Sequence, residues 1–248
     1  MTRTLLSALA LSTALAAPAG ALDLSKMTTE EKAAFGEAVK DYLMQNPEVL
    51  VEAINVLEER QQAAAVENDK TLVDTNAKDI FEDGFSWIGG NPQGDVTIVE
   101  FMDYKCTYCK KAFPEVEDLL KKDGNIRLIV KEFPILSQQS ELGARFAVAT
   151  KQVAGDAAYK TVHDALIGMR GDISLEGLKR LAEDNKFDAD AIIKKMNTEE
   201  VTAVLRANHQ LAERMNISGT PTFIIGNEML RGYAPEEAMA KIVAEQRG

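Results

Sequence analysis

The chain has few residues of the kinds that hold metal ions. Its 248 residues include two cysteines and two histidines. A structural zinc site needs about four ligands, and His163 and His209 lie in helical stretches far along the chain from the cysteines. The nine methionines are scattered and one is the initiator, so they do not form a copper(I) site. We therefore expect no metal site and no organic cofactor.

Long hydrophobic runs are absent beyond the N-terminus. The chain opens with a basic residue, Arg3, then runs apolar from Leu5 to Ala17 and reaches the small residues Ala19-Gly20-Ala21. These are the parts of a secretory signal peptide, and the run is shorter than the roughly 20 apolar residues of a membrane-spanning helix. We expect residues 1–21 to be a signal peptide cleaved after about Ala21, with a retained anchor or buried helix as the alternative. The mature protein is then expected to be exported and soluble, with no stable membrane insertion.

Positive charge is also in short supply. Lysine and arginine total 28 against 39 acidic residues, a formal net charge of −11. A nucleic-acid-binding surface needs basic residues to neutralise phosphates. The balance therefore argues against nucleic acid as a partner, and ordinary solubility explains the acidic surplus.

The two cysteines stand together as Cys106-Thr107-Tyr108-Cys109. The run Val96–Met102 before them is apolar and β-branched and predicts a buried strand, whereas Lys110–Lys121 has apolar residues near helical spacing. Cys106 should therefore lie at a helix N-terminus, where backbone N–H groups and the helix dipole stabilise a thiolate. Since the thiolate is the reactive form, we predict a redox-active dithiol, with Cys106 the exposed nucleophile and Cys109 the resolving thiol.

Half of a zinc site and a structural disulfide are the alternatives for this motif. A disulfide that closes so small a loop removes little chain entropy, so its structural value is low. Export to an oxidising compartment instead allows the pair to give disulfides to other proteins or to rearrange them.

Residues 22 to about 75 show no strand signal and are rich in helix-forming residues. Thr28 or Thr29 can cap a first helix that runs to Met44, and Asn46-Pro47-Glu48 signals a second helix start. A short heptad pattern follows, with Leu43, Leu50, Leu57 and Ala64 at seven-residue steps. It is too short to decide between self-association and docking of an amphipathic helix on its own domain. Residues 71–83 are polar without periodicity and indicate a linker or frayed helix, so we place the N-terminal segment at 22–78.

The remainder, residues 79–248, alternates strand and helix signals. Phe85–Ile88 indicates a short edge strand, and Val96–Met102 and Ile126–Glu132 are strong strand signals. Residues from about 138 to 215 are helical throughout, Thr222–Leu230 is typical of a hairpin, and Pro235 opens a last helix. The pattern predicts an α/β domain whose sheet is interrupted by a helical insertion.

Three features together resemble the DsbA family of thioredoxin-fold thiol–disulfide oxidoreductases: the segment Glu100–Lys111, the helical block, and Gly219–Phe223. The resemblance covers roughly residues 85 to 248. The stretch Tyr42–Ala53 is similar to the N-terminal segment of ScsC-type relatives, which are periplasmic DsbA-like proteins, some of them trimeric disulfide isomerases linked to copper tolerance. The resemblance implies a thioredoxin fold with an inserted all-helical subdomain, preceded by an N-terminal helical segment. It also favours self-association, with a homotrimer as the implied form.

The resemblance assigns roles to individual residues. It implies a cis bond at Thr220-Pro221, in a loop that faces the cysteines and pairs with the client chain, although sequence alone favours trans. It places Glu100 beneath the cysteines as a proton relay; an acid on an exposed sheet edge is the alternative. Thr107 and Tyr108 contact the client, and their lack of histidine, unlike the strongest oxidants of the family, implies a less acidic Cys106 and a moderately oxidising disulfide.

These observations predict periplasmic thiol–disulfide exchange on cysteine-containing secreted client proteins, as a disulfide isomerase or oxidase. Threonine before the proline is similar to the isomerases. A membrane redox partner is implied, to reduce or reoxidise the dithiol. Copper(I) binding by the same two soft thiols is the rival function, since thiolates suit that ion.

Overall fold

The structure is a computed structural model that describes residues 27–248. The expected signal peptide lies outside the described residues. The chain divides into two compact units, one ending at Glu59 and one running from Arg60 to Gly248. Within residues 27–248, no helix combines the length and apolar character needed to cross a membrane.

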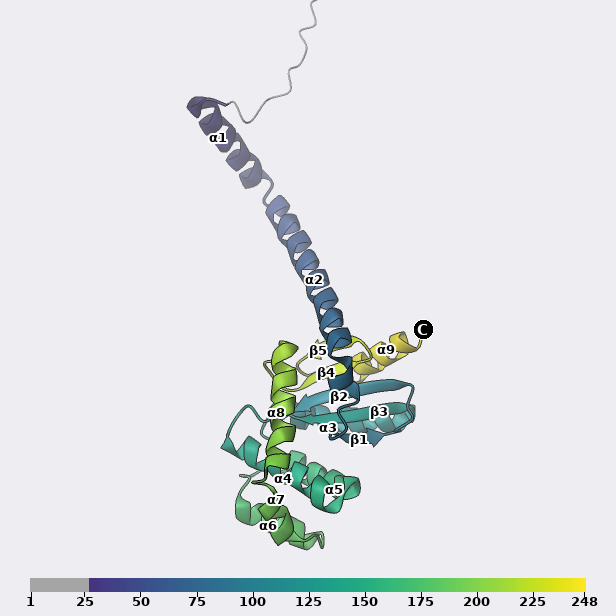
Figure 1. Cartoon of the computed structure of the whole chain (residues 1–248). Coiled ribbons are helices and arrows are strands. Elements are labelled where there is room, and N and C mark those ends of the chain that lie inside the picture. The colour runs from purple at the N-terminus through teal and green to yellow at the C-terminus, as the bar shows by residue number, and fades with distance from the viewer. Residues whose placement is uncertain (1–26) are drawn as a thin grey trace, which may run out of the picture. The chain divides into compact units, whose positions relative to one another are not determined.

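Two helices form the N-terminal part of the described chain (Figure 1). The first, α1 (Thr29–Gln45), begins with a capping box in which Thr28 and Glu31 satisfy each other's backbone N–H groups. The second, α2 (Glu48–Phe81), follows Pro47. No residue of α1 is buried, and the buried residues of α2 lie in its C-terminal half.

Five strands form one mixed sheet in the order β1-β3-β2-β4-β5. Its strands are β1 (Trp87–Gly90), β2 (Val96–Met102), β3 (Ile126–Glu132), β4 (Thr222–Ile225) and β5 (Glu228–Arg231). The central strand β2 runs parallel to β3 and antiparallel to β4, and β1 pairs antiparallel with β3 at the edge. The two strongest strand predictions match β2 and β3 in their bounds, because their apolar residues are buried on both faces.

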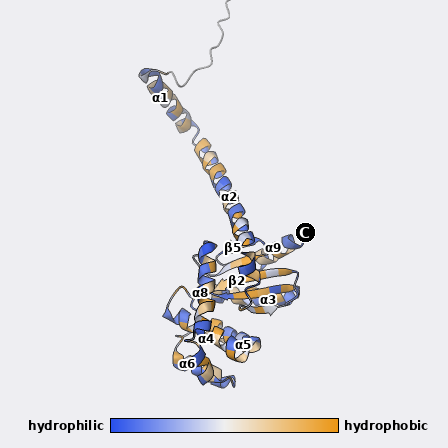
Figure 2. Ribbon diagram, in the orientation of Figure 1, coloured by the Kyte–Doolittle hydropathy of each residue, from blue (hydrophilic) through white to orange (hydrophobic). Residues whose placement is uncertain are grey.

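The helices cover both faces of this sheet. The even-numbered side chains of β2, such as Ile98 and Met102, pack with α3 (Thr107–Asp123) and α9 (Glu236–Arg247). The odd-numbered side chains, Val99 and Phe101, pack with the C-terminal half of α2 and the end of α8. Hydrophilic and hydrophobic residues are interspersed along these helices (Figure 2), as expected for amphipathic helices on a sheet.

Five helices occupy the chain between β3 and β4. They are α4 (Gln138–Ala154), α5 (Asp156–Gly168), α6 (Leu175–Asp184), α7 (Ala189–Lys195) and α8 (Glu199–Arg214). The core-facing side chains of α4–α7 and of the first half of α8 join the same cluster as α3 and the even-numbered face of β2. The insertion therefore shares one core with the sheet, and its residues line that core close to the cysteines.

Of the two interpretations of residues 71–83, a linker or a frayed helix, the linker is wrong. Helix α2 continues through Phe81, and its residues Val73 and Ile80 are buried against the sheet. The polar composition misled the prediction because only Val73 and Ile80, seven positions apart, are buried in this stretch, and Phe81 is partly buried against the same core. Two of its acidic residues, Asp79 and Asp83, are used in ion pairs.

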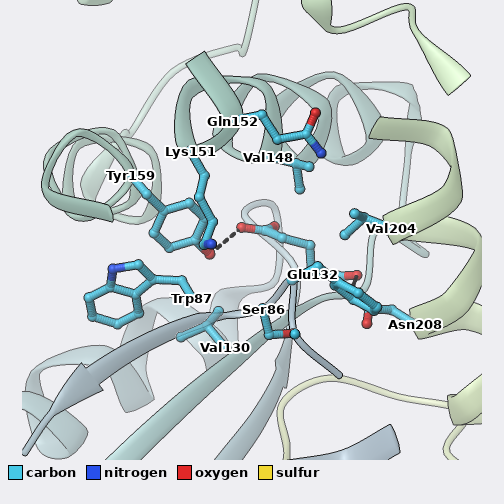
Figure 3. Close-up of a pocket in the computed structure, with 12 residues that line it drawn as sticks. Ser86, Trp87, Val130, Glu132, Val148, Lys151, Gln152, Tyr159, Val204 and Asn208 are labelled. Carbon is cyan, nitrogen blue, oxygen red and sulfur yellow. Dashed lines mark hydrogen bonds between the residues drawn. The ribbon is translucent and has the colours of Figure 1, made fainter. Parts of the chain in front are cut away.

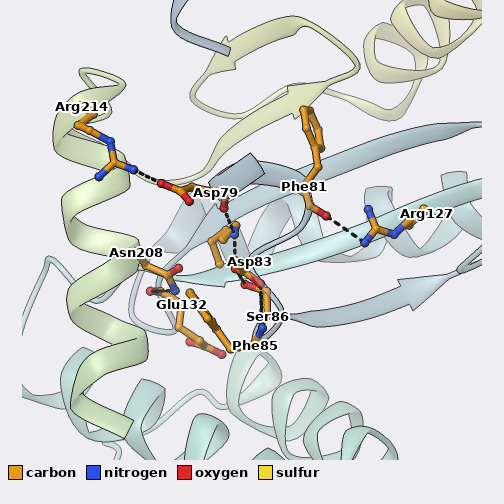
Figure 4. A network of polar contacts seen from close by, with 10 residues as sticks. Asp79, Phe81, Asp83, Phe85, Ser86, Arg127, Glu132, Asn208 and Arg214 are labelled. Carbon is orange, nitrogen blue, oxygen red and sulfur yellow. Dashed lines mark hydrogen bonds and ion pairs between the residues drawn. The ribbon is translucent and has the colours of Figure 1, made fainter. Parts of the chain in front are cut away.

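Those ion pairs fasten the end of α2 to the domain (Figure 4). The Lys131 ammonium group pairs with Asp83 and donates a hydrogen bond to the Asp79 carbonyl oxygen at 2.8 Å. Arg214 of α8 pairs with the Asp79 carboxylate at 2.6 Å. Lys131 is fully buried, so this pair is one whose loss leaves an uncompensated charge.

Candidate active site

Cys106 caps helix α3. Its Sγ accepts a hydrogen bond from the Cys109 N–H at 3.3 Å, and its own N–H donates to the Asp103 carbonyl oxygen at 3.0 Å. The helix begins at Thr107, so Cys109 lies in its first turn. The sequence predicted this placement of Cys106, because an apolar strand ends four residues before it.

The environment of Cys106 favours the thiolate. The pKa of its thiol is lowered to about 6, chiefly by a hydrogen bond from the Cys109 thiol; Thr220 and the N–H groups of Tyr108 and Cys109 add to this and burial opposes it. A thiol with a pKa of about 6 is about nine-tenths ionised at pH 7. The prediction that Cys106 is exposed is wrong, since it is only 5% exposed. The Thr220 carbonyl oxygen, 3.2 Å from Sγ, covers it.

Cys109 has the opposite character. It is fully buried, and burial raises the pKa of its thiol well above the ordinary range, with further increases from the Cys106 hydrogen bond and the Glu100 charge. Both cysteines are free thiols in this structure. The pair therefore consists of one thiol that ionises readily and one that keeps its proton.

Glu100 lies in the middle of the central strand β2, opposite Val130 of β3 and Phe223 of β4. It is 6% exposed, so the alternative of an acid on an exposed edge is wrong. Burial, with smaller contributions from the charges of Cys106 and Glu132, raises the pKa of its carboxyl group to about 8. Glu100 is thus a buried acid in electrostatic contact with both cysteines, able to hold a proton at neutral pH.

The Thr220-Pro221 peptide bond is cis, as the resemblance implied. It directly precedes β4, and β4 pairs with β2, which leads into the cysteine turn. A hollow of about 260 Å³ adjoins it, lined by residues 218–222, Arg231 and Gly232. The Thr220 Oγ1 atom is buried and has no hydrogen-bond partner among the described residues.

The two residues between the cysteines face outward. Thr107 is exposed at the first position of α3, and Tyr108 is 60% exposed. The Tyr108 ring lies 6.3 Å from that of Tyr233, in the segment between β5 and α9. The structure therefore places all seven sequence-predicted site residues around one turn, with Glu100 below and Tyr108 above it.

Two further acids support this turn, and the sequence analysis missed both. The Asp103 carboxylate accepts hydrogen bonds from the N–H groups of Lys105, Ile135 and Leu136 at 2.8 to 3.1 Å. Glu132 accepts one from the Tyr104 hydroxyl at 2.7 Å. The signal for Glu132 was the one that identified Glu100, an acid inside an apolar strand, but no motif drew attention to it.

The two histidines lie in packed environments away from the cysteines. Among residues 27–248, no group of three or more histidine, cysteine or acidic side chains is arranged to hold an ion. His163 is buried beside Tyr104 and His209 packs against Phe133, so the histidines serve the core.

A CxxC motif at a helix start, opposite a cis-proline loop on a five-stranded mixed sheet, defines a thioredoxin-like protein. Residues 97–244 match the family described as "DSBA-like thioredoxin domain", and the chain belongs to this family. Residues 31–64 match a second family, described as "Copper resistance protein ScsC N-terminal domain". The expected thioredoxin fold with a helical insertion and an N-terminal helical segment is thereby confirmed.

Solved structures agree with this assignment. A thioredoxin-like oxidoreductase from Silicibacter pomeroyi is 35% identical, with a TM-score of 0.65; the match covers 69% of this chain and 98% of that one. BcfH from Salmonella enterica Typhimurium is 27% identical, with a TM-score of 0.75, over 88% of this chain and 97% of that one. The chain thus has the fold of the DsbA-like thiol–disulfide oxidoreductases.

The curated relatives include longer proteins. The Na(+)/H(+) antiporter NhaA 1 of Salinispora arenicola is 28% identical over 157 residues, which is 63% of this chain and 24% of the antiporter. The chain therefore spans about a quarter of the length of such relatives, and their transport activity is no guide to its function.

Proposed function

We propose that the chain is a thiol–disulfide oxidoreductase that acts on cysteine-containing secreted client proteins. The observation that carries this proposal is the contrast between the two thiols: the pKa of Cys106 is lowered to about 6 and that of Cys109 is raised. Such a contrast gives one thiol that is a thiolate nucleophile at neutral pH. The other thiol stays protonated and reacts only with the mixed disulfide between Cys106 and the client.

The first step is attack by the Cys106 thiolate on a client disulfide. A bond forms between Cys106 Sγ and one client sulfur, and the other client sulfur leaves as a thiolate. The client segment lies against the Thr220-Pro221 loop, whose carbonyl oxygen already borders the Cys106 sulfur at 3.2 Å. Thr107 and Tyr108, the exposed residues between the cysteines, contact the client on the outer side.

Release follows one of two routes. In isomerisation, another client thiolate attacks the mixed disulfide, and Cys106 returns to its thiolate form with no net electron transfer. In reduction, Cys109 passes its proton to ionised Glu100 and attacks Cys106 Sγ. The Cys106–Cys109 disulfide forms, the bond between Cys106 and the client sulfur breaks, and that sulfur leaves as a thiolate, so two electrons move from the dithiol to the client. Oxidation of a client dithiol is the reverse of this route. Glu100 suits the proton transfer because its pKa, about 8, lies near the working pH.

We assign isomerase or oxidase as the direction, with isomerase favoured by threonine before Pro221. The test is refolding of a substrate protein with scrambled disulfides by the wild-type protein, Cys106→Ala and Cys109→Ala. Cys106→Ala should be inactive, whereas Cys109→Ala should still rearrange disulfides but release reduced clients slowly. Equal activity of Cys106→Ala and the wild-type protein excludes the function.

We also propose that α1 and the first half of α2 mediate self-association, as a homotrimer. Their exposed apolar side chains include Phe35, Val39, Tyr42, Leu50, Ile54 and Leu57. Leaving these side chains in water forgoes roughly 25 cal/mol for each Å² of apolar surface they would bury on association. The solution mass of the full mature chain should fall to that of a monomer in Leu50→Glu with Ile54→Glu, and stay unchanged in the matched control Glu52→Gln. An unchanged mass in the double variant contradicts the proposal.

The proposal includes export to the periplasm, with the signal peptide cleaved after about Ala21. It also includes a membrane partner that reoxidises or reduces the Cys106–Cys109 pair. The mass of the protein recovered from the periplasm reports the cleavage site directly. For the rival function, copper(I) affinity should be compared between the wild-type protein and a Cys106→Ala, Cys109→Ala variant. Tight copper(I) binding that depends on both cysteines, in a protein without disulfide-exchange activity, favours copper binding as the function.

A further inference from the structure

Glu132 is a second buried carboxyl group on the sheet face that carries Glu100. It ends β3 and is only 3% exposed. Val130 pairs with Glu100, and side chains two positions apart on a strand point to the same face. Glu100 and Glu132 therefore share one face, yet the exchange steps described above use only Glu100.

One oxygen of Glu132 joins two separate parts of the fold. Its Oε1 accepts a hydrogen bond from the Tyr104 hydroxyl at 2.7 Å and another from the Tyr159 hydroxyl at 2.6 Å. Tyr104 belongs to the turn that leads into Cys106, and Tyr159 belongs to α5 of the helical insertion. Figure 3 shows Tyr159 directed at the Glu132 carboxyl group.

The other oxygen of Glu132 is unused. Its Oε2 is buried with no hydrogen-bond partner among the described residues, and the same holds for Asn208 Oδ1. Both side chains line a cavity of about 200 Å³ between the sheet and the insertion (Figure 3). Burial raises the pKa of Glu132 to about 8. This carboxyl group is therefore neutral over the acidic and neutral pH range.

Tyr104 is fixed on all sides. It is fully buried, and its hydroxyl also lies 3.1 Å from His163 Nδ1. Its ring packs on α4 at Gly143, where a Cβ atom would lie 3.1 Å from the Tyr104 Cδ2 atom. The carbonyl oxygen of the preceding residue, Asp103, accepts a hydrogen bond from the Cys106 N–H. A displacement of Tyr104 therefore also displaces Cys106, which caps α3.

We propose that Glu132 is a positioning residue for disulfide exchange: its carboxyl group holds Tyr104, and with it the turn that carries Cys106, against the helical insertion. This inference rests on the proposed function. It adds that the charge state of Glu132 affects the proton held by Glu100, because the two carboxyl groups repel each other when both are ionised.

Titratable and polar groups face Glu132 from each element packed on it. They are Asp103 and Tyr104 of the turn, Glu100 of β2, Tyr159 and His163 of α5, Lys151 of α4 and Asn208 of α8. His163 is neutral, since burial lowers its pKa to about 3. Lys151 is the one cation of this set, and it pairs with Asp156 at 3.1 Å. Ionisation of Glu132 is thus opposed by its acidic neighbours.

The experiment measures exchange with a small disulfide, and resolution of the mixed disulfide across pH, in the full-length protein. Tyr104→Phe should slow exchange about tenfold, the equivalent of one lost buried hydrogen bond at about 1.4 kcal/mol. Tyr159→Phe removes the other donor to the same oxygen and should slow exchange less, because α5 does not carry the cysteines.

Glu132→Gln separates charge from position. The amide oxygen still accepts from both tyrosines, but no second charge acts on Glu100, so the pH midpoint of resolution should move below that of the wild-type protein. The exposed control Glu176→Gln should leave this midpoint unchanged. Folded Tyr104→Phe with the wild-type rate, or Glu132→Gln with an unshifted midpoint, overturns the inference. If the wild-type protein does not catalyse exchange, the proposed function fails and the inference fails with it. If the wild-type protein is active and only the results for the variants differ from those expected, the inference alone fails.

Discussion

The sulfur of Cys106 lies 3.2 Å from the carbonyl oxygen of Thr220, although the two residues are 114 positions apart in the sequence. Strands β2 and β4 are antiparallel neighbours in the sheet, so the segment after β2 lies beside the segment before β4. The whole helical insertion is placed between these two segments in the chain without separating them in space. This contact brings the nucleophile and the proposed client-binding loop together.

The first prediction concerns the acidity of Cys106. A hydrogen bond from the Cys109 thiol is the largest cause of its lowered pKa, so Cys109→Ala should raise that pKa toward the ordinary range. Thiolate absorbance, or alkylation rate against pH, measures the midpoint. The wild-type midpoint should lie near pH 6. A midpoint that Cys109→Ala leaves unmoved would show that the Cys109 thiol does not cause the acidity of Cys106.

The second prediction concerns the Thr220 hydroxyl. While Cys106 is a thiol, this hydroxyl has no hydrogen-bond partner among residues 27–248, so at a pH where Cys106 is protonated Thr220→Val should not lower the free energy of unfolding. Thr220 also contributes to the lowered pKa of Cys106, which should therefore rise in this variant. Denaturant unfolding and a thiolate titration measure the two effects. A loss of more than about 1 kcal/mol would show that the hydroxyl makes a stabilising contact.

The third prediction gives the sign of a pH effect. The pKa of Glu100 is about 8 in the folded protein and about 4.3 in an unfolded chain. Between these values the folded state binds one more proton, so its stability falls as pH rises. Glu100→Gln lacks this loss, and its melting temperature relative to the wild-type protein should increase from pH 5 to pH 8. A difference that is flat with pH, or that decreases, contradicts the buried placement of Glu100.

The fourth prediction tests whether the end of α2 belongs to the catalytic unit. Ile80 is fully buried against the sheet, so Ile80→Ala should cost roughly 2–5 kcal/mol of unfolding free energy. Val66 of the same helix is exposed, and Val66→Ala should cost less than about 0.5 kcal/mol. Similar, small losses in both variants would restore the linker interpretation. For the same reason, a truncated form should start near Arg60 and not after Val73.

The sequence predicted most elements because their signals are local. Strands β2 and β3 are apolar runs of fixed length, and α3 follows from the spacing of its apolar residues. Residues 71–83 failed because the docking of Val73 and Ile80 depends on a sheet formed later in the chain. Two buried residues and the partly buried Phe81 among thirteen are too weak a periodic signal to separate a helix from a linker.

The site shows the same division. Cys106 and Cys109 were found from their spacing, and Glu100 from a charge in an apolar strand. The burial of Cys106 was not foreseen, since the Thr220 carbonyl that covers it comes from a distant segment. Glu132 was missed because its partners, Tyr104 and Tyr159, are brought to it by the fold and share no motif with it.

The most direct test of the account identifies the sulfur that attacks the client. A peptide disulfide should be mixed at pH 7 with wild-type protein, Cys106→Ala and Cys109→Ala, quenched with acid, and examined by peptide mass spectrometry. The account predicts peptide attached to Cys106 in Cys109→Ala, and almost none attached to Cys109 in Cys106→Ala. Equal labelling of the two cysteines, or labelling of Cys109 alone, would contradict the claim that Cys106 is the nucleophile.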